Sequence, residues 1–431
     1  MKLAIIGGAG VRVPLLVGGL ARSTLSIDQI DLYDIDQPRL AVIADLAARM
    51  AHGVPVHAHT SAEPGIDGAD FVITSIRVGG VAQRAQDEAT TISHGVVGQE
   101  TVGPAGFAMA VRTIPPLIEY GRLASRLAPK AWFVNFSNPV SVVSQAVHQH
   151  SDARIIGICD TPTETYEDAA HALGLPPAAC DYDYFGLNHL GWLREVYFQG
   201  EPQMARLWSD TARLDAAYRT PLFEHERLRE MRLLPTEYLY YYYRPDVALA
   251  HLRAAGTSRG QVVSALTDAF FADLAAGAID PVTRYQHYLA ARDSSYMQLE
   301  SGSTTPRVKP DWAELSGYDK IALMTISAIA GNTGAVIPLN LANQGILPFL
   351  DDDDIIETPC VVDAAGPHAR PVAAVPNHAR ALITCVKEYE RATVKAALSG
   401  ERDDRIDALA MNPLVPSRPL AEQLVDALFP A

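Results

Sequence analysis

The chain has 431 residues, of which 48% are hydrophobic and 20% charged, and it carries a formal net charge of −15. This length exceeds what one small core can organise and predicts two closely packed domains. The negative charge excludes nucleic acid and anionic membranes as general partners, so an anionic substrate has to be met by a local group of arginines.

The sequence shows neither an export signal nor a membrane span. The apolar run within the opening residues, MKLAIIGGAG, is too short for a signal peptide, and no run of about 18 apolar residues follows. The four cysteines lie far apart without CxxC spacing, at Cys159, Cys180, Cys360 and Cys385. We therefore expect reduced thiols and a cytoplasmic protein.

The N-terminal half alternates between predicted strands and helices. Helix-length segments such as 37–51 and 105–128 separate short apolar runs, which lie at 2–6, 29–36, 69–76, 131–137 and 153–160. Such alternation predicts a parallel, doubly wound sheet of the Rossmann type. We place this NAD-binding domain at residues 1–185.

A glycine-rich turn follows the first predicted strand. Gly8-Ala9-Gly10 supplies two glycines of the dinucleotide fingerprint G-x-G-x-x-G, although Val13 stands at the third position. Asp34 ends the second strand, where a carboxylate can take the ribose hydroxyls and favours NAD over NADP. The turn and the acid together predict NAD binding; a tight strand–helix turn beside an incidental acid is the simpler alternative.

Polar and charged side chains are dense in the glycine-rich segment 75–116, which holds Arg77, Arg84 and Glu100. Glycines in such a loop serve backbone geometry next to a ligand, whereas a solvated charged loop is the alternative. Asn138, in the sequence FSNP, ends another predicted strand and can hydrogen-bond a hydroxyl. These residues are candidates for ligand contact.

Cys159 and Asp160 stand at the tip of a predicted strand in GICDTPTE, and His189 follows in GLNHL. At this edge of a parallel sheet, where ligands bind, the thiol can be core packing, a nucleophile or a metal ligand. A lone histidine among apolar residues is most often a core residue, but with Cys159 and Asn188 it supports an open metal site of nitrogen and sulfur ligands. A closed zinc site is excluded, because there is no four-ligand cluster.

The second half of the chain, 186–431, is expected to form a mixed α+β domain for substrate binding and oligomerisation. Helices are predicted at 260–277, 283–299 and 377–400, and strands and loops at 332–362.

Two local patterns stand out in this half. LPTEYLYYYYRP, which holds Tyr238 and the run 240–243, predicts a half-buried amphipathic helix whose phenols reach water. One of the five tyrosines can be catalytic, and the sequence does not choose among them. The run 351–354, DDDD, is expected to be a solvated turn.

Taken in order, several motifs resemble the NAD- and divalent-metal-dependent glycoside hydrolases of family 4. They are the N-terminal glycine turn, IRVGG with the following R..DE, GQETVGPAGFAMAVRTIP, SNP, the Cys-x-x-Pro strand end, GLNHL, P..YL.YYY and LPFLDDDDIIETP. Their order and spacing extend over nearly the whole chain, and the 6-phospho-β-glucosidases are the branch that they resemble most. The resemblance implies a fold like that of lactate and malate dehydrogenases, NAD, a divalent metal that is usually manganese, and a homodimer or homotetramer.

The resemblance also implies roles for single residues. Cys159 and His189 match the family's metal ligands. Tyr238, the first tyrosine of P..YL.YYY, matches the base of the β-type enzymes, and Arg84 and Glu100 match an active-site pair.

Further matches concern the sugar and its phosphate. Asn138 and Asn188 match residues that line the sugar site, and Arg259, in TSRGQVV, matches an arginine near the phosphate. Because the net charge is negative, a sugar phosphate requires bidentate guanidinium groups, and Arg84 or Arg292 can assist Arg259.

On the cofactor side, contacts are expected from Gly8, Gly10, Arg12, Asp34 and Arg77. The family's turn usually runs Gly-Gly-Gly-Ser, followed by a tyrosine and a threonine before proline. This chain has GGAGVRVP instead. Arg12 can replace the missing hydroxyl contacts to the cofactor phosphates by its charge.

Two further departures concern the substrate. The β-type enzymes tend to carry Asn after the metal cysteine, whereas Asp, here Asp160, is typical of the 6-phospho-α branch. The sequence RDSSYM, at 292–297, stands where the β branch commonly has a Gly-Gly pair before the tyrosine. A 6-phospho-α-glucosidase and a glycosidase for unphosphorylated substrates therefore remain alternatives.

The implied reaction differs from that of ordinary glycosidases, which use two carboxylates. In it, NAD oxidises C3 of the 6-phospho-β-glucoside, the metal stabilises the enolate, and Tyr238 removes the C2 proton. The aglycone is then eliminated, water adds and the hydride returns. Two alternatives come from other classes: an NAD-dependent 2-hydroxyacid dehydrogenase, which needs a His–Asp pair and no metal cysteine, and an NAD-sensing binding protein.

Overall fold

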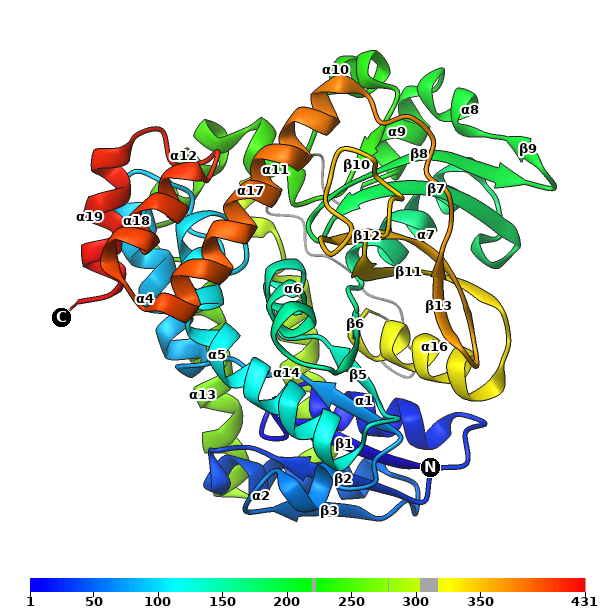
Figure 1. The fold of residues 1–431 in the computed structure, drawn as a ribbon, viewed down its shortest axis with the longest axis vertical. Coiled ribbons are helices and arrows are strands. Elements are labelled where there is room, and N and C mark those ends of the chain that lie inside the picture. Colours follow the sequence, from blue (N-terminus) through cyan, green and yellow to red (C-terminus); the bar gives the residue numbers. More distant parts are fainter. Residues whose placement is uncertain (219–221, 278, 303–316, 431) are drawn as a thin grey trace.

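A sheet of thirteen strands organises the part of the chain that the computed structural model describes, residues 1–218, 222–277, 279–302 and 317–430. The strands are β1 (Lys2–Ile6), β2 (Gln29–Tyr33), β3 (Val56–His59), β4 (Phe71–Thr74), β5 (Trp132–Asn135), β6 (Arg154–Gly157), β7 (Cys180–Leu187), β8 (Leu190–Phe198), β9 (Glu201–Pro202), β10 (Leu234–Pro235), β11 (Ala335–Ala342), β12 (Ile355–Asp363) and β13 (Gly366–Ala369). The main order is β10-β8-β7-β12-β11-β6-β5-β4-β1-β2-β3, with β13 beside β12 and β9 beside β8 (Figure 1).

The half of the sheet from β6 to β3 is parallel throughout. Its order, β3-β2-β1-β4-β5-β6, is that of dinucleotide-binding folds, so the predicted Rossmann-like sheet is confirmed. These strands are apolar because both faces are covered. In β1, for example, Leu3 and Ile5 join the core on one face, while Ala4 and Ile6 join the core on the other.

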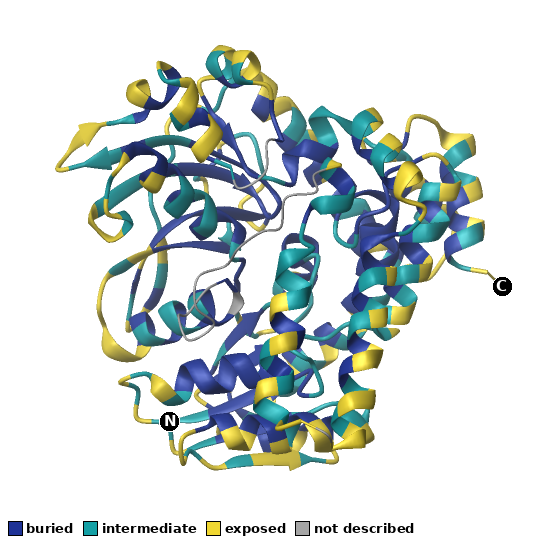
Figure 2. Cartoon of the chain, turned by 180° about the vertical axis from the view of Figure 1, so that it is seen from behind, coloured by how far each residue is buried: buried dark blue, intermediate teal, exposed yellow. Residues whose placement is uncertain are grey.

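Helices cover both faces of this parallel half. One face carries α1 (Val13–Arg22), α2 (Gln37–Met50), α13 (Arg259–Ala276), α14 (Pro281–Ser294) and α16 (Tyr318–Gly331). The other carries α3 (Glu63–Ile66), α5 (Gly103–Leu127) and α6 (Val140–His150). Figure 2 shows the inner strands as the buried layer, whereas the edge strand β3 is partly exposed and other exposed residues lie on the outer sides of the helices.

The remaining helices surround the antiparallel half of the sheet or connect the two halves. They are α4 (Gly80–Ser93), α7 (Thr161–Leu173), α8 (Met204–Trp208), α9 (Thr211–Ala216), α10 (His225–Met231), α11 (Leu239–Tyr243), α12 (Pro245–Ala255), α15 (Gln298–Ser301), α17 (Asn377–Ser399), α18 (Arg402–Met411) and α19 (Arg418–Leu428), with a 3₁₀ turn at Pro177–Ala179. Many of them share one core with β7 and β8.

The antiparallel half is joined to the parallel half through β11, which pairs with β6. β12 then pairs with β11 on one side and with β7 on the other, so the sheet runs without a break through both predicted domains. The predicted boundary, between residues 185 and 186, lies inside β7. The division of the chain into 1–185 and 186–431 stays a prediction.

Two predicted helices in the second half differ from the observed ones. The helix expected at 283–299 ends at Ser294, and the backbone takes a left-handed conformation at Met297 (φ 57°) before α15 begins. The tyrosine-rich helix is a single short turn, α11, and Tyr240 and Tyr241 are buried, with hydroxyls directed at Glu300 O and Met297 Sδ. These two phenols therefore do not reach water, contrary to the expectation, whereas Tyr242 and Tyr243 are half-buried.

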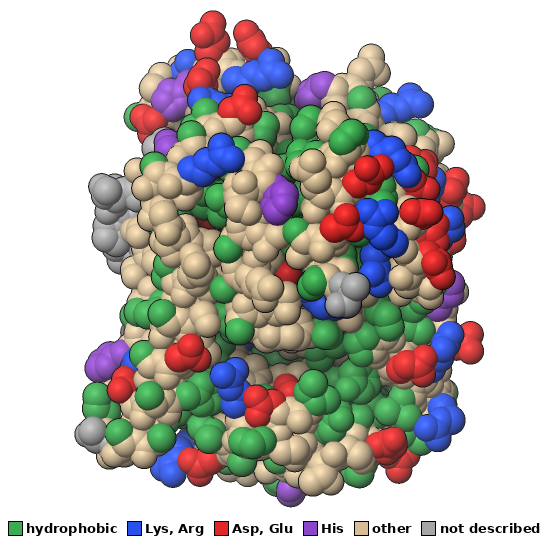
Figure 3. All heavy atoms as spheres, turned by 90° about the vertical axis from the view of Figure 1, so that its left-hand side faces the viewer, with side chains coloured by type: hydrophobic (Ala, Val, Ile, Leu, Met, Phe, Trp, Pro, Cys, Tyr) green, Lys and Arg blue, Asp and Glu red, His purple; other side chains and the backbone are tan. Residues whose placement is uncertain are grey.

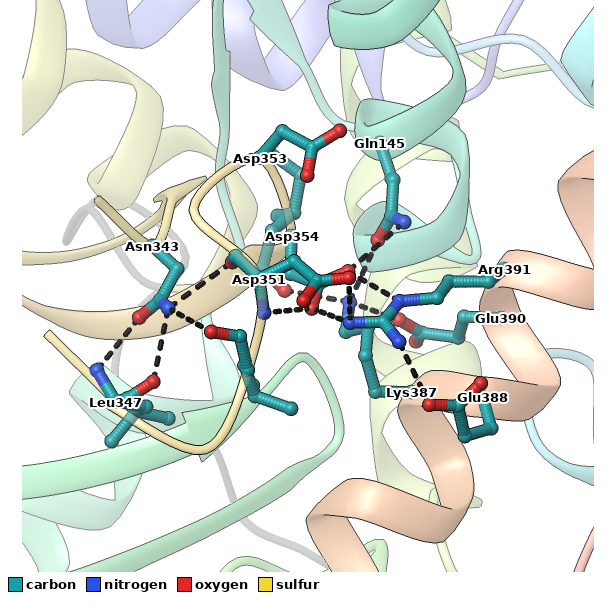
Figure 4. Close-up of polar contacts among 12 residues, drawn as sticks. Gln145, Asn343, Leu347, Asp351, Asp353, Asp354, Lys387, Glu388, Glu390 and Arg391 are labelled. Carbon is teal, nitrogen blue, oxygen red and sulfur yellow. Dashed lines mark hydrogen bonds and ion pairs between the residues drawn. The ribbon is translucent and has the colours of Figure 1, made fainter. Parts of the chain in front are cut away.

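The acidic run 351–354 is also more than a solvated turn. Asp352 and Asp353 are exposed, but Asp354 is buried, and the guanidinium group of Arg391 on α17 donates to both of its carboxylate oxygens (Figure 4). Gln145 on α6 reaches the same carboxylate, at 3.3 Å. The run fastens the β11–β12 loop to two helices.

Lys387 forms a second buried connection close to this loop (Figure 4). Its ammonium group is fully buried and donates to the Ile355 carbonyl at 2.7 Å, to Gln145 Oε1 at 2.9 Å and to Glu390 Oε2 at 2.5 Å. The start of β12 is thereby held by α17 and α6.

Within the described residues, no helix combines the length and the hydropathy that a membrane crossing requires. On the face shown in Figure 3, basic and acidic side chains alternate around a hollow rimmed by hydrophobic residues. This face offers no continuous positive surface to a polyanion, in keeping with the net charge of −15.

Candidate active site

A cleft of about 640 Å³ opens at the carboxyl ends of the parallel strands. The turns after β1, β2, β4, β5 and β6 line it, together with α13, α14 and the turn between β7 and β8. The predicted site residues that line this cleft are Gly10, Arg12, Asp34, Arg77, Arg84, Glu100, Asn138, Cys159, His189, Tyr238 and Arg259. The fold thus brings eleven residues together that are far apart in the sequence.

Two predicted residues do not line the cleft. Gly8 faces β2 and α2, since a Cβ there would lie 3.0 Å from Leu32 Cβ and from Leu40 Cδ1. Glycine at this position therefore allows close packing of helix and strand and does not contact a ligand. Asn188 points behind the cleft, where its Nδ2 donates to Glu357 Oε1 at 3.3 Å.

The glycine turn is closed by backbone contacts that leave no room for side chains. Gly7, with φ 94°, lines the cleft, and a Cβ there would lie 2.3 Å from the Ser75 carbonyl oxygen. The Gly10 amide donates to Gly7 O at 3.0 Å, and the Ala9 amide donates to Asp34 Oδ2 at 3.1 Å. Asp34 therefore fixes the turn as well as facing the cleft.

These features fit a dinucleotide. The positive end of α1 begins directly after the turn, with Arg12 at its N-cap, so that a pyrophosphate would meet helix amides and a guanidinium group. The carboxylate of Asp34 stands where the ribose hydroxyls would lie.

Cys159 and His189 come from different parts of the sheet. Cys159 follows β6, and His189 occupies the tight turn between β7 and β8 with φ 61°. Burial lowers the pKa of His189 to about 3, so its imidazole is neutral. Burial, Glu357 and Asp160 raise the pKa of the Cys159 thiol well above its usual value.

The hydrogen bonds of Thr101 identify the tautomer of His189. Gln99 Oε1 accepts from the Thr101 amide at 2.7 Å, from the Thr101 hydroxyl at 2.8 Å and from the Val102 amide at 2.8 Å. Since the single hydroxyl proton of Thr101 is used there, its oxygen accepts from His189 Nδ1 at 2.8 Å. The proton of His189 thus lies on Nδ1, and Nε2 keeps a free electron pair for a cation.

The donor chemistry of this pair fits a divalent transition metal. A neutral imidazole nitrogen and a thiol sulfur suit such an ion, and a bound cation would offset the burial that now keeps Cys159 protonated. Among the described residues no group of three or more His, Cys, Asp or Glu side chains is placed to hold a metal. Two protein ligands would leave coordination positions for a substrate.

Tyr238 lies directly against His189. The two rings stack at 3.7 Å between centroids with 5° between their planes, and the hydroxyl oxygen of Tyr238 lies 3.2 Å from that of Tyr296. Burial, Glu237 and Glu100 raise the pKa of Tyr238 well above its usual value. A phenolate at this position therefore needs added positive charge.

Glu100 is enclosed by guanidinium groups. Arg84 Nη1 contacts Glu100 Oε2 at 2.8 Å, and Arg77 Nη2 donates to the same oxygen. Burial alone would raise the pKa of Glu100, but the charges of Arg77 and Arg84 lower it to about 2. Arg84 also donates to Glu88 Oε1 at 2.8 Å and is 7% exposed.

Arg259 is the first residue of α13 and is nearly as buried as Arg84. It donates to Ser295 Oγ at 2.5 Å and to the Arg292 carbonyl at 2.6 Å. Burial and Arg84 lower its pKa, and burial and Arg12 lower that of Arg292. Arg84, Arg259 and Arg292 thus line one cleft, where they offer bidentate partners to an anion.

Asn138 lines the same cleft. Its Oδ1 atom is buried and has no hydrogen-bond partner within the described chain. A buried polar atom without a partner is costly, so a ligand hydroxyl is its natural partner.

Several cleft residues escaped the sequence analysis. Tyr296 reaches Tyr238 because the chain turns after Ser294, and its hydroxyl donates to Glu237 Oε1 at 2.5 Å. In the sequence, nothing singles out Glu237, and Tyr296 is marked only by the departure from the β branch at RDSSYM. The interaction of Thr101 with His189 was equally hidden, although both lie in motifs that the sequence analysis had marked.

Comparison with known proteins shows which family the sequence of this chain matches. The family described as Family 4 glycosyl hydrolase matches residues 2–175, and the Family 4 glycosyl hydrolase C-terminal domain matches residues 184–415. A 6-phospho-beta-glucosidase of Escherichia coli (strain K12) is 31% identical over 98% of this chain and 93% of that protein. A maltose-6'-phosphate glucosidase of Bacillus subtilis (strain 168) is 28% identical over 100% of this chain and 95% of that protein.

Solved structures support the fold. The 6-phospho-beta glucosidase from Thermotoga maritima, determined with manganese, NAD+ and glucose-6-phosphate, is 25% identical with a TM-score of 0.83, covering 99% of this chain and 97% of that one. Malate dehydrogenase from Cryptosporidium parvum matches at a TM-score of 0.55 and 11% identity, over 92% of this chain and 99% of that one. The expected likeness to the malate dehydrogenase fold is thus confirmed.

Proposed function

Because the chain belongs to family 4 of the glycosyl hydrolases, we propose that it is an NAD- and divalent-metal-dependent glycosidase that hydrolyses 6-phosphoglucosides, with the β anomer preferred. One observation carries this proposal: a thiol, a neutral imidazole and a stacked phenol meet in the same cleft as Arg84, Arg259 and Arg292. The 6-phospho-β-glucosidase and maltose-6'-phosphate glucosidase relatives support the substrate class.

When bound, NAD would exchange a hydride with C3 of the sugar, and the divalent metal would act as a Lewis acid on the neighbouring oxygens. We assign the metal to Cys159 and His189, and the dinucleotide to Gly10, Arg12 and Asp34. Arg77, which also lines the cleft, is a further candidate for cofactor contact and pairs with Glu100.

Tyr238 is our candidate for the group that takes the C2 proton. Its stacking on His189 fixes the phenol beside the proposed metal ligands. Because its surroundings raise its pKa, the cation and Arg84 have to supply the positive charge that makes the phenol a base. Tyr296 holds the hydroxyl in place at 3.2 Å.

The substrate phosphate is proposed to bind at Arg259, with Arg84 and Arg292 nearby. All three are in the cleft, and the pKa values of Arg259 and Arg292 are lowered by burial and by other guanidinium groups. A phosphate would replace the present contacts of Arg259 with Ser295 or join them.

Asn138 is proposed to bind a sugar hydroxyl through its unpartnered Oδ1. Asn188, in contrast, supports the site from behind.

The α-glucosidase is the second candidate, and Asp160 is the observation that favours it. This residue lines the cleft next to Cys159, whose Sγ lies 4.0 Å from its Oδ1. The 2-hydroxyacid dehydrogenase is less favoured, since His189 is bonded to Thr101 and the described residues place no carboxylate on its ring.

The deciding assay uses p-nitrophenyl α- and β-glucosides, each with and without a 6-phosphate, in the presence of NAD, Mn²⁺ and a thiol reductant. We expect release of p-nitrophenol from the 6-phospho-β-glucoside without net formation of NADH, because the hydride returns within each turnover. A preference for the α anomer would instead identify the enzyme as a 6-phospho-α-glucosidase. Stoichiometric NADH would instead indicate a dehydrogenase, and no metal-stimulated turnover would leave an NAD-binding protein.

A further inference from the structure

One row of paired residues crosses the sheet between the two proposed metal ligands. Gly157 of β6 pairs with Asn340 of β11, Asn340 pairs with Glu357 of β12, and Glu357 pairs with Gly186 of β7. Cys159 follows Gly157 by two residues, and His189 follows Gly186 by three. The spacing of the two ligands is therefore set by the strands between them.

Glu357 is the only charged residue in that row, and it is buried, with 1% exposure. Its carboxylate accepts from the Tyr184 hydroxyl at 2.6 Å, from Asn340 Nδ2 at 2.8 Å and from Asn188 Nδ2 at 3.3 Å. The three donors come from β7, β11 and the turn that carries His189. A single carboxylate thus connects the elements on both sides of the ligand pair.

All three donors are neutral, and within the described residues no lysine or arginine forms an ion pair with Glu357. A buried carboxylate without a countercharge is costly. A divalent cation on Cys159 would provide the missing positive charge.

We propose that Glu357 is a positioning residue of the metal site, which fixes the separation of Cys159 and His189 through its hydrogen bonds to the elements on both sides. It does not line the cleft, so it would act through Asn188 and the sheet without touching the ion. The inference rests on the proposed function, because it takes Cys159 and His189 as the ligands. Carboxylates that orient metal ligands from behind commonly change metal affinity when they are replaced.

The position of Glu357 is itself fixed at the start of β12, close to which it lies. Lys387 holds the Ile355 carbonyl at 2.7 Å, and Arg391 holds Asp354, two and three residues before Glu357 (Figure 4). The strand therefore cannot shift its register easily, and the carboxylate is presented at a constant depth in the sheet.

The test measures metal binding without turnover. Mn²⁺ affinity is determined by titrating the full-length protein and following the EPR signal of free Mn²⁺, and ligand geometry is followed by the sulfur-to-metal absorption of the Co²⁺-loaded protein. We expect Glu357→Gln to raise the Kd for Mn²⁺ about ten- to a hundredfold and to shift the Co²⁺ band.

Asp31→Asn is the matched control. Asp31 is another carboxylate with 1% exposure in the same sheet, on β2, where it contacts His59 Nε2 at 2.7 Å away from the cleft lining. Its replacement should leave the Mn²⁺ affinity within about twofold of the wild type, and binding of NAD, measured by fluorescence, should be retained in both variants.

An unchanged Mn²⁺ affinity and Co²⁺ spectrum in Glu357→Gln would overturn the inference. If that variant does not fold, Tyr184→Phe decides in its place, because it removes a single donor to Glu357 and keeps the ring; a wild-type affinity and spectrum there would contradict the proposal. The variant Cys159→Ser distinguishes a failure of the proposed metal site from a failure of the role proposed for Glu357. If it leaves metal binding unaltered, the proposed metal site itself is wrong, whereas a loss with Cys159→Ser and none with Glu357→Gln defeats only the role of Glu357.

Discussion

At the scale of single residues, burial sets the charge of each group in the cleft. It keeps His189 neutral and ready to bind a cation, and it keeps Cys159 and Tyr238 protonated. Glu100 is the opposite case, because Arg77 and Arg84 outweigh its burial and keep it ionised. The reactive groups therefore depend on an added cation, while the arginine side of the cleft is already charged.

The arginine side gives the first prediction. Arg259→Ala should lower kcat/KM for the 6-phosphoglucoside about a hundredfold, since roughly two charge-assisted hydrogen bonds to the phosphate are lost. The kcat/KM for the unphosphorylated glucoside should change less than about threefold, because no phosphate contact is lost there. Arg122→Ala, an exposed arginine paired with Glu119, serves as the control. Equal losses on both substrates would show that Arg259 does not recognise phosphate.

Glu100 gives a prediction for pH. Its pKa in the folded protein is about 2, below the value of about 4.3 expected in the unfolded chain. Its stabilising contribution is therefore fully present above about pH 5 and is lost as the pH falls toward 2. Urea unfolding of wild type and Glu100→Gln should show a difference of about 3 kcal/mol at neutral pH that shrinks below pH 5. A difference that does not vary with pH would contradict this assignment.

At the scale of elements, the ends of helices and strands decide where side chains arrive. The capping box of Ser258 and Gln261 begins α13 and so places Arg259 at the cleft. The chain leaves α14 after Ser294, and Tyr296, which precedes the left-handed residue Met297, reaches Tyr238. The sequence pattern predicted both helices, but such a change of direction depends on packing that periodicity does not contain.

The buried contact between α17 and β12 allows a paired test on one helix. Lys387→Met should lower the free energy of unfolding by about 3 to 5 kcal/mol, because Glu390 and the Ile355 carbonyl lose a buried partner. Lys395→Met, eight residues later, removes an exposed lysine paired with Asp404 and should cost less than about 1 kcal/mol. Similar losses, measured by urea unfolding, would show that burial of Lys387 is not what stabilises this junction.

At the scale of the whole molecule, the fold of the N-terminal half could be predicted from the sequence, and the fold of the other half could be predicted only in part. Alternating apolar runs were enough to predict the parallel sheet, and the glycine turn together with the family resemblance supplied the eleven cleft residues. Gly8 and Asn188 were misplaced because chain position alone does not tell which side of a turn a residue faces. Glu357 was missed because its importance comes from strand neighbours that are distant in sequence.

The cleft joins elements from both halves, so NAD should stabilise the entire molecule. The increase follows RT ln(1 + [NAD]/Kd), or about 2.7 kcal/mol at a hundredfold excess over Kd, and should appear as a rise of Tm with NAD concentration. NADP should give a smaller rise at equal concentration, because its 2'-phosphate would lie beside the carboxylate of Asp34. Equal rises in differential scanning fluorimetry would mean that Asp34 does not select the cofactor.

The insertion of β11 and β12 between β6 and β7 also has a consequence for synthesis on the ribosome. Cys159 and His189 are both translated before residue 190, yet the two strands that place them in one sheet end only at Asp363. A nascent chain can complete its cofactor half early, since domains form as their residues emerge. The metal centre, in contrast, has to wait until more than four fifths of the polypeptide has been made.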